Sequence, residues 1–352
     1  MTTFCTLDDD LAELCGVSDF SGVEDAPEEA DDDDDDDDAR AAPPLEVARV
    51  ALAELRAARF ASEFAAPRVP VVVEGCARAA WFPAHLTLDR LVARHGEKPI
   101  PLEPGSARAR HDVPLRAFAA ALRRPAADDA AGLGALYLRN AHCAAWLGDD
   151  AAALAPPPIF GPNLLADAAA TPGVPRAWRA WAELFVCGPR CAGYPFTHRD
   201  VAATSAYSMQ VEGAKTFVLF APDAAHAAAL YAEPAGAGAS GRRSAVPDVA
   251  TALGLRGRGG EARAALLARF PALRRARPVV ARLGPGDVLF CPPEWWHTTF
   301  PTPPAAGGAA GAPCVTVGGN FVEAHGHEAF LDAYADHAAL ASLQSAGAAA
   351  MR

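Results

Sequence analysis

The sequence contains no uninterrupted run of about 20 apolar residues, which is the length that a membrane-spanning helix needs. Its first 38 residues contain no lysine or arginine, whereas a signal peptide begins with a basic segment followed by a hydrophobic core. Organelle transit peptides are poor in acidic residues, and this N-terminus is rich in them. We therefore expect no membrane association and a location in the nucleus, the cytoplasm or both.

Cysteines are few and scattered. The eight cysteines stand at positions 5, 15, 76, 143, 187, 191, 291 and 314, a spacing that does not form the framework of a disulfide-rich protein. Cys187 and Cys191 are the only close pair in the body of the sequence. A zinc half-site at this pair would need a second pair with comparable spacing, and the sequence has none. We expect reduced, structural thiols.

Negative charge is concentrated at the N-terminus. The first 38 residues hold 17 of the 43 acidic residues, including eight consecutive aspartates at 31–38, so the remainder has 26 acidic against 31 basic residues. Mutual repulsion and few apolar side chains oppose packing of the acidic segment. We expect residues 1–44 to be a disordered acidic leader. A solubilising role is favoured over docking to a basic partner.

Apolar spacing predicts mostly helices in the first part of the body. Apolar stripes among alanines and arginines predict helices over residues 46–64, 87–95 and 115–123. Residues 69–73 predict a short strand.

From Leu136 onward the pattern is typical of strands. Short runs rich in Val, Phe, Tyr and Leu alternate with Gly/Pro clusters, which indicates a sandwich or barrel of antiparallel strands. Residues 234–277 look like an insertion between strands, with a helix at 261–270. Residues 328–343 predict a C-terminal helix whose apolar face needs a partner.

Two metal-capable side chains, His198 and Asp200, lie two residues apart. On a strand this spacing places both side chains on one face, whereas on a helix they would diverge. A third candidate, His297, ends the string LGPGDVLFCPPEWWH. Two histidines and a carboxylate leave three positions of an iron ion open for a bidentate oxoacid and dioxygen. The alternatives are a surface hydrogen-bonding pair and a core histidine.

Lys215 adds support for an iron site at His198, Asp200 and His297. It lies in a run at residues 209–220 that otherwise reads as a buried strand. A lysine inside such a strand is costly unless it meets an anion, and the distal carboxylate of 2-oxoglutarate would be that anion. The alternative is a lysine at a strand end whose amino group reaches solvent.

Three strings resemble the core of the JmjC-domain oxygenases: HRDVAATSAYSMQVEGAKTFVLFAP (198–222), LGPGDVLFCPPEWWHTTF (283–300) and CVTVGGNF (314–321). They are similar above all to the soluble lysyl-hydroxylase and arginine-demethylase-like branch and its cupin-like relatives. The resemblance covers residues 65–325.

The resemblance implies the roles of individual residues. It assigns His198, Asp200 and His297 to Fe(II), and Lys215 to 2-oxoglutarate. Additional cosubstrate-binding candidates are Ser208, where close relatives place an asparagine, Asn320, at a position that is often polar near the metal, and Tyr137, as a second cosubstrate contact.

The implied fold is mainly β, with a double-stranded β-helix (jelly-roll or cupin) core and flanking α-helices. We divide the chain into the leader (1–44), a helical or mixed flank (45–130), the JmjC/cupin-like core (131–325) and a C-terminal helix (326–352). The apolar face of this helix either mediates formation of a homodimer or packs back on the barrel.

The implied function is that of a dioxygenase that uses Fe(II), 2-oxoglutarate and O2 to hydroxylate, or else demethylate, a protein side chain. A related branch hydroxylates a tRNA base, and backbone contacts to RNA would involve the arginines at 242, 243, 256, 258, 274, 275 and 277. A catalytically inactive cupin-fold binding protein is the non-enzymatic alternative.

Overall fold

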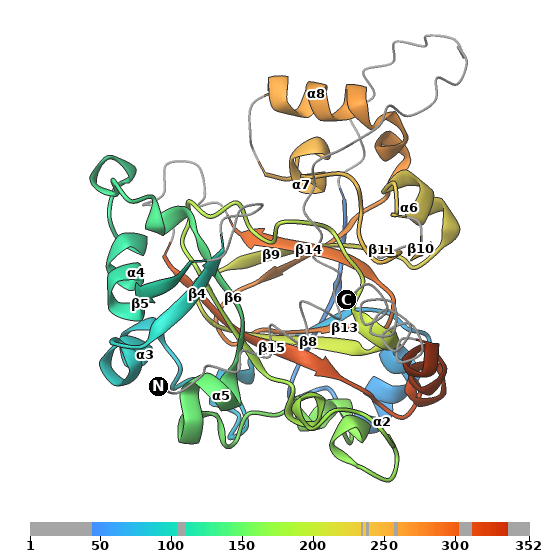
Figure 1. The fold of residues 1–352 in the computed structure, drawn as a ribbon. Helices are drawn as coiled ribbons and strands as arrows, with labels where there is room; N and C mark the ends of the chain where they lie inside the picture. Colours follow the sequence, from blue (N-terminus) through green and yellow to red (C-terminus); the bar gives the residue numbers. More distant parts are fainter. Residues whose placement is uncertain are drawn as a thin grey trace, which may run out of the picture.

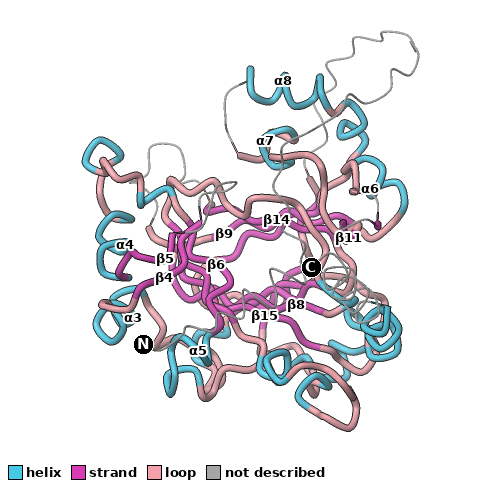
Figure 2. The backbone as a smooth tube through the Cα atoms, viewed as in Figure 1, coloured by secondary structure: helices cyan, strands magenta, loops and turns pink. Residues whose placement is uncertain are grey.

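Strands in two sheets dominate the part of the chain that the structure describes. The computed structural model describes residues 44–103, 110–233, 235–236, 239–256, 260–302 and 312–336. The expected acidic leader, except for its last residue, lies outside these ranges. Figure 2 shows strands gathered in the middle of the molecule and helices around them.

The larger sheet has nine strands and the smaller has four (Figure 1). In spatial order the larger contains β2 (Ala48–Ala51), β3 (Val71–Glu74), β13 (Val288–Cys291), β8 (Ser205–Glu212), β15 (Cys314–Phe321), β7 (Glu183–Cys187), β6 (Tyr137–His142), β4 (Pro99–Glu103) and β5 (Arg110–Pro114). The smaller contains β1 (Leu45–Glu46), β12 (Val279–Leu283), β9 (Lys215–Phe220) and β14 (Trp296–Pro301). The mainly β fold with flanking helices, predicted from the sequence, is confirmed.

The pairing within the sheets is mostly antiparallel. Only β1 with β12 and β2 with β3 pair in parallel among the described strands of the two sheets. Strands from the flank at residues 45–130 occur in both sheets, so the flank and the core share their sheets.

Several of the predicted helices are confirmed. Thr87 caps α3 (Leu88–His95) by accepting a hydrogen bond from the Arg90 amide. Further described helices are α4 (Leu115–Leu122), α8 (Gly260–Arg269) and the short helices α2 (Ala57–Phe60), α5 (Cys143–Leu147), α6 (Ala224–Ala229) and α7 (Val249–Ala252). Several 3-10 turns and a π-helical turn at Ala61–Ala65 accompany them. None of the described helices has the length and apolar character needed to cross a membrane.

The single helix predicted over residues 46–64 is wrong. Its first part forms β1 and β2, and only the part from Ala57 is helical. The Val47 amide donates to the Val280 carbonyl at 2.9 Å, and Val50 pairs with Val73. Because both valines are buried, sheet pairing outweighs the helical preference of the surrounding alanines.

The run at residues 209–220 is not one strand but the crossover between the sheets. β8 ends at Glu212 in the larger sheet, and β9 begins at Lys215 in the smaller. Gly213 makes the corner with a φ of +69°, and a Cβ atom there would lie 2.4 Å from the Pro313 carbonyl oxygen. The chain therefore needs glycine at this point.

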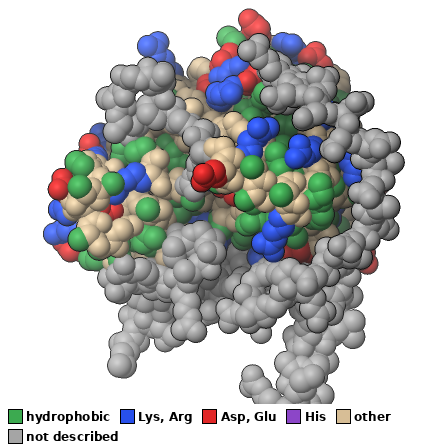
Figure 3. Space-filling view, turned by 90° about the horizontal axis from the view of Figure 1, so that it is seen from above, with side chains coloured by type: hydrophobic (Ala, Val, Ile, Leu, Met, Phe, Trp, Pro, Cys, Tyr) green, Lys and Arg blue, Asp and Glu red, His purple; other side chains and the backbone are tan. Residues whose placement is uncertain are grey.

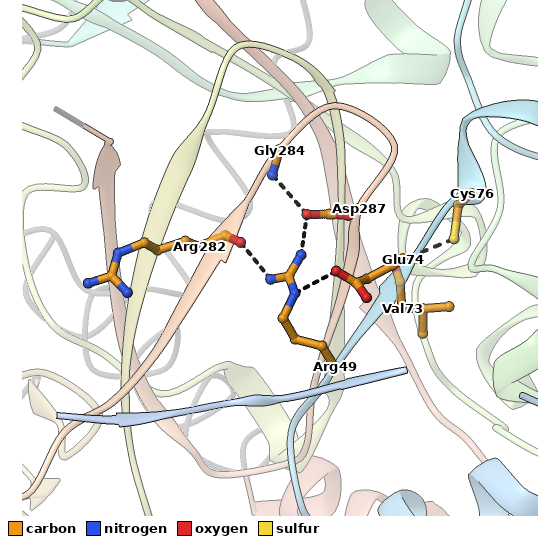
Figure 4. A network of polar contacts seen from close by, with 7 residues as sticks. All are labelled: Arg49, Val73, Glu74, Cys76, Arg282, Gly284 and Asp287. Carbon is orange, nitrogen blue, oxygen red and sulfur yellow. Dashed lines mark hydrogen bonds and ion pairs between the residues drawn. The ribbon is translucent and has the colours of Figure 1, made fainter. Parts of the chain in front are cut away.

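Arg49 links the two sheets (Figure 4). From β2 its guanidinium donates to Glu74 Oε1 at 2.7 Å, to Asp287 Oδ2 at 2.7 Å and to the Arg282 carbonyl of β12 at 2.8 Å. Asp287 also accepts from the Gly284 amide at 2.9 Å, which closes the turn between β12 and β13.

The insertion covers the outer face of the smaller sheet (Figure 1). Side chains alternate along β9: Val218 and Phe220 pack against the insertion, whereas Phe217 and Leu219 pack between the sheets. The metal candidate His297 lies on the inward side, since its neighbour Trp296 packs against the insertion.

The described part of the C-terminal helix, residues 327–336, packs on its own chain. Phe330 is fully buried in a cluster with Leu165, Trp178 and Val322. This packing agrees with the alternative that the helix packs back on its own chain, and the homodimer stays a prediction. Residues 337–343 of the predicted helix lie outside the described residues.

Candidate metal centre

The two histidines are brought together by backbone pairing. The His198 amide donates to the His297 carbonyl at 3.0 Å, and the His297 amide donates back at 2.8 Å. His297 is the second residue of β14, whereas His198 lies in an extended segment that is bridged to His297 on one side and to Arg243 on the other, rather than in a regular strand. The ring centroids consequently lie 4.3 Å apart.

Asp200 joins them two residues later. Its backbone is still extended, with φ −69° and ψ 158°, so it keeps the orientation expected for spacing by two. Asp200 Oδ1 lies 4.0 Å from His198 Nε2, and Oδ2 lies 3.9 Å from His297 Nε2. One ligand atom from each of the three residues lies within 4.8 Å of the others, and no other group of three such side chains converges this closely in the described ranges.

Hydrogen bonding and burial keep both imidazoles suitable as ligands. His297 Nδ1 lies 3.1 Å from the Trp295 carbonyl oxygen, which can only accept, so Nδ1 donates there and Nε2 is the nitrogen directed at the cluster. Burial, and then the neighbouring His297, hold the pKa of His198 well below its usual value. The neutral form that a metal requires is therefore favoured.

The segment that carries His198 is held on both sides. Tyr194 stacks on the His198 ring with centroids 4.6 Å apart and planes 17° apart. Arg199 points away, donating to Glu294 Oε2 at 2.6 Å and lying 4.7 Å from the Trp296 ring centroid. Sequence reasoning missed both contacts, although the alternation of Tyr194, Phe196 and His198 was a signal that one face of the segment is built from rings.

Lys215 is buried, with 2% of its surface exposed. Its Nζ donates to the Tyr137 hydroxyl at 2.8 Å and lies 5.4 Å from the Phe185 ring centroid. In the register of β9 with β14, Leu219 is opposite His297 and Lys215 is opposite Pro301. Lys215 and His297 thus share the inward face, about 13 Å apart along the strands.

Ser208 and Asn320, the other cosubstrate-binding candidates, lie on the larger sheet opposite. Ser208 pairs with Gly318, where an added Cβ would come within 3.4 Å of both the Ser208 Oγ and the Phe185 ring. The same Cβ would lie 2.9 Å from the Tyr207 carbonyl oxygen, so glycine permits the close approach of the two strands beside Ser208. The Asn320 amide donates to the Thr204 hydroxyl at 2.9 Å, which gives it a structural bond near the metal candidates.

A half-open cavity of about 220 Å³ lies on the insertion side of the same segment. Tyr194, Phe196, Thr299 and Arg256 contribute to its wall, but the three metal candidates and Lys215 do not. Arg256 is held by Asp248 at 3.2 Å and lies over the Phe300 ring.

The arginines considered for RNA contacts are therefore partly structural. Besides Arg256, Arg277 donates to the carbonyls of Arg274 and Ala276, and Arg258 lies outside the described residues. On the insertion side of the molecule, Figure 3 shows Lys and Arg side chains scattered among hydrophobic ones.

Comparison with known families supports the fold and the superfamily. Residues 164–317 match a family model described as a cupin-like domain. The matched range includes the three metal candidates and Lys215, and it supports the cupin/JmjC superfamily. A search of curated proteins finds no match to the chain.

Proposed function

We propose that this protein is an Fe(II)- and 2-oxoglutarate-dependent dioxygenase that hydroxylates a protein side chain. The observation that carries the proposal is the convergence of His198, Asp200 and His297 within 4.8 Å of one another, on the inward side of a cupin-type fold. Lys215, buried on the same face, adds a cationic group for a dicarboxylate.

The donor set fits a ferrous ion. Two neutral imidazoles and one carboxylate occupy one side of the metal and leave positions for an oxoacid and dioxygen, unlike the closed four-ligand sets of structural zinc. When bound, the ion would supply activation of dioxygen coupled to oxidative decarboxylation of the oxoacid.

The protein side chains hold and orient the reactants. Lys215, with Tyr137 beside it, offers a charge-assisted hydrogen bond to the distal carboxylate of 2-oxoglutarate. Ser208, which pairs with Gly318 on the larger sheet, offers a hydroxyl to the oxoacid. The Arg199–Glu294 ion pair fixes the segment between His198 and Asp200, and Phe217 and Leu219 exclude water from the inner face.

An anaerobic titration tests the proposal. Adding Fe(II) and then 2-oxoglutarate should produce the weak visible charge-transfer band of an iron-bound oxoacid. His198→Ala should remove it, whereas Arg59→Ala, at an exposed helical ion pair away from the site, should keep it. A folded protein without the band would instead be a binding module.

The substrate class is tested by release of succinate. We expect turnover with protein peptides, such as histone-tail, ribosomal or splicing-factor sequences. Turnover only with total tRNA would favour the RNA-base branch, and formaldehyde release with a methylated peptide would favour demethylation over hydroxylation.

A further inference from the structure

Three thiols that are separated in sequence gather beside Lys215. Cys187 ends β7, Cys191 lies in the loop after it, and Cys314 begins β15. All three are buried in one cluster together with Tyr137, the residue that accepts the Lys215 hydrogen bond. Sequence spacing identified the pair of Cys187 and Cys191, but Cys314 joins them only through the sheet.

The sheet register makes Cys187 and Cys314 direct neighbours. They are opposite each other in the antiparallel pair of β7 and β15, and Tyr137 is opposite Cys187 on β6. Opposite Cα atoms in such a pair lie about 4.5–5.5 Å apart, within the roughly 4.4–6.8 Å that a disulfide spans. The two thiols can therefore join without a change of strand pairing.

The surroundings of Cys314 favour its reactive form. A hydrogen bond with Cys187 and the charge of Lys215 outweigh burial and lower the pKa of the Cys314 thiol to about 7. The thiolate is the nucleophile in oxidation by peroxides, so the lowered pKa favours the reaction. The Cys314 Sγ also lies 3.0 Å from the Ala214 carbonyl oxygen, to which the neutral thiol donates.

We propose that Cys314 and Cys187 form a peroxide-reactive thiol pair beside Lys215 and Tyr137, and that this pair is joined reversibly as a disulfide. The Cys314 thiolate attacks one oxygen of hydrogen peroxide, the O–O bond breaks, and the hydroxide released takes up a proton to become water. Cys187 then attacks the Cys314 sulfenic sulfur and displaces a second water. Two thiols are oxidised and one peroxide is reduced to two waters.

Occupancy of the pocket should control this oxidation. The thiols border the Lys215–Tyr137 hydrogen bond, so an oxoacid bound there would shield them from peroxide. This part rests on the proposed function, whereas the thiol pair itself does not.

Peptide mapping of the full chain tests the pair. After treatment with hydrogen peroxide and alkylation of the remaining thiols, cleavage with trypsin separates Cys187 from Cys191 at Arg190. A protease specific for glutamate separates Cys291 from Cys314 at Glu294. We expect a reductant-sensitive crosslink between the Cys187 and Cys314 peptides.

Matched variants give the decisive comparison. Cys191→Ala removes a thiol of the same cluster and should keep the crosslink, whereas Cys314→Ala should abolish it. A crosslink of Cys187 to Cys191 in the unsubstituted protein, or none at Cys187, overturns the assignment.

Ligand protection tests the location. With Mn(II) and 2-oxoglutarate at ten times its Kd, crosslinking should slow by about tenfold, because only the free fraction reacts. An unchanged rate refutes a location at the pocket. The anaerobic titration reports separately whether the oxoacid binds, so the two failures are distinguishable.

Discussion

Lys215 is a cation with 2% of its surface exposed, and among the described residues it forms no ion pair. Burying a charge costs several kcal/mol unless a counter-charge compensates it. The Tyr137 hydroxyl and two aromatic rings satisfy its geometry but not its charge. Apart from the ionisable Cys314 thiol beside it, no described carboxylate forms an ion pair with Lys215, so the site can accept an anionic ligand.

Substitution of Lys215 tests this reading. Lys215→Met keeps the length of the side chain and removes the charge, so 2-oxoglutarate affinity should fall by about 10–100-fold, the value of a lost hydrogen bond to a charged group. The free energy of unfolding without ligand should not fall, because an uncompensated buried charge is removed. Calorimetric titration with Mn(II) present measures the affinity, and chemical denaturation measures the stability.

Tyr137→Phe is the matched control, since it removes the hydroxyl partner and keeps the charge. Its effect on affinity should be smaller than that of Lys215→Met. Equal affinity in Lys215→Met and the unsubstituted protein would exclude Lys215 from the oxoacid site.

The convergence of His198, Asp200 and His297 could be predicted from the sequence, and the roles of these residues stay predictions. The spacing of His198 and Asp200 and the unusual lysine in an apolar run were readable, because each breaks the pattern around it. Neither the stacking of Tyr194 on His198 nor the bond of Asn320 to Thr204 could be read. Both depend on which segments pair in three dimensions.

At the scale of elements, the corner between β8 and β9 positions Lys215. Gly213 turns the chain from one sheet to the other in a left-handed conformation. A Cβ atom added at Gly213 would lie 3.0 Å from the Cα and Sγ atoms of Cys314. The sequence showed one apolar run because a crossover between two buried strands needs only a single glycine. The residues before and after Gly213 are similarly apolar, so the sequence does not reveal that they belong to different sheets.

Gly213→Ala should lower the free energy of unfolding by about 1–3 kcal/mol more than the same substitution at a positive-φ glycine in open space. This difference is the usual cost of overpacking. Gly75→Ala is the control, since Gly75 has a φ of +76° and no atom within 4 Å of the added Cβ. Both variants carry the same backbone strain. Urea unfolding of the pair measures the difference, and equal losses would show that the corner can relax.

The hydrogen bonds of Arg49 between the two sheets lead to a further prediction, which concerns stability. Arg49→Met removes three hydrogen bonds that join β2, β3 and β12, so the free energy of unfolding should fall by about 1–2 kcal/mol after allowance for partial exposure. Arg59→Met, at an exposed i,i+4 pair with Glu63, should cost at most about 0.5 kcal/mol. Thermal unfolding compares them, and similar losses would make Arg49 an ordinary surface ion pair.

The N-terminal flank explains why element prediction failed where it did. Alanine and arginine are good helix formers, and residues 46–64 contain many of both. Val47 and Val50 nevertheless enter sheets whose other strands come from residues near 73 and 280. Pairing over such sequence distances leaves no periodic signal in the local sequence.

For the whole molecule, the candidate site joins parts of both sheets. His297 and Lys215 come from the smaller sheet, whereas Tyr137 and Ser208 come from the larger. A ligand held by all of them would bind only the assembled fold and would therefore stabilise the entire domain.

Metal and oxoacid should raise the thermal midpoint in separable steps. At 100 times its Kd, a ligand specific for the native state adds about 2.7 kcal/mol, which raises the thermal midpoint by roughly 4–5 °C for a domain of this size. Mn(II) should produce a first increment and 2-oxoglutarate a second. Lys215→Met should lose only the second, whereas His198→Ala should lose both because the oxoacid would have no metal to chelate. Scanning calorimetry measures the increments, and identical shifts in all three proteins would reveal a general salt effect instead of a site.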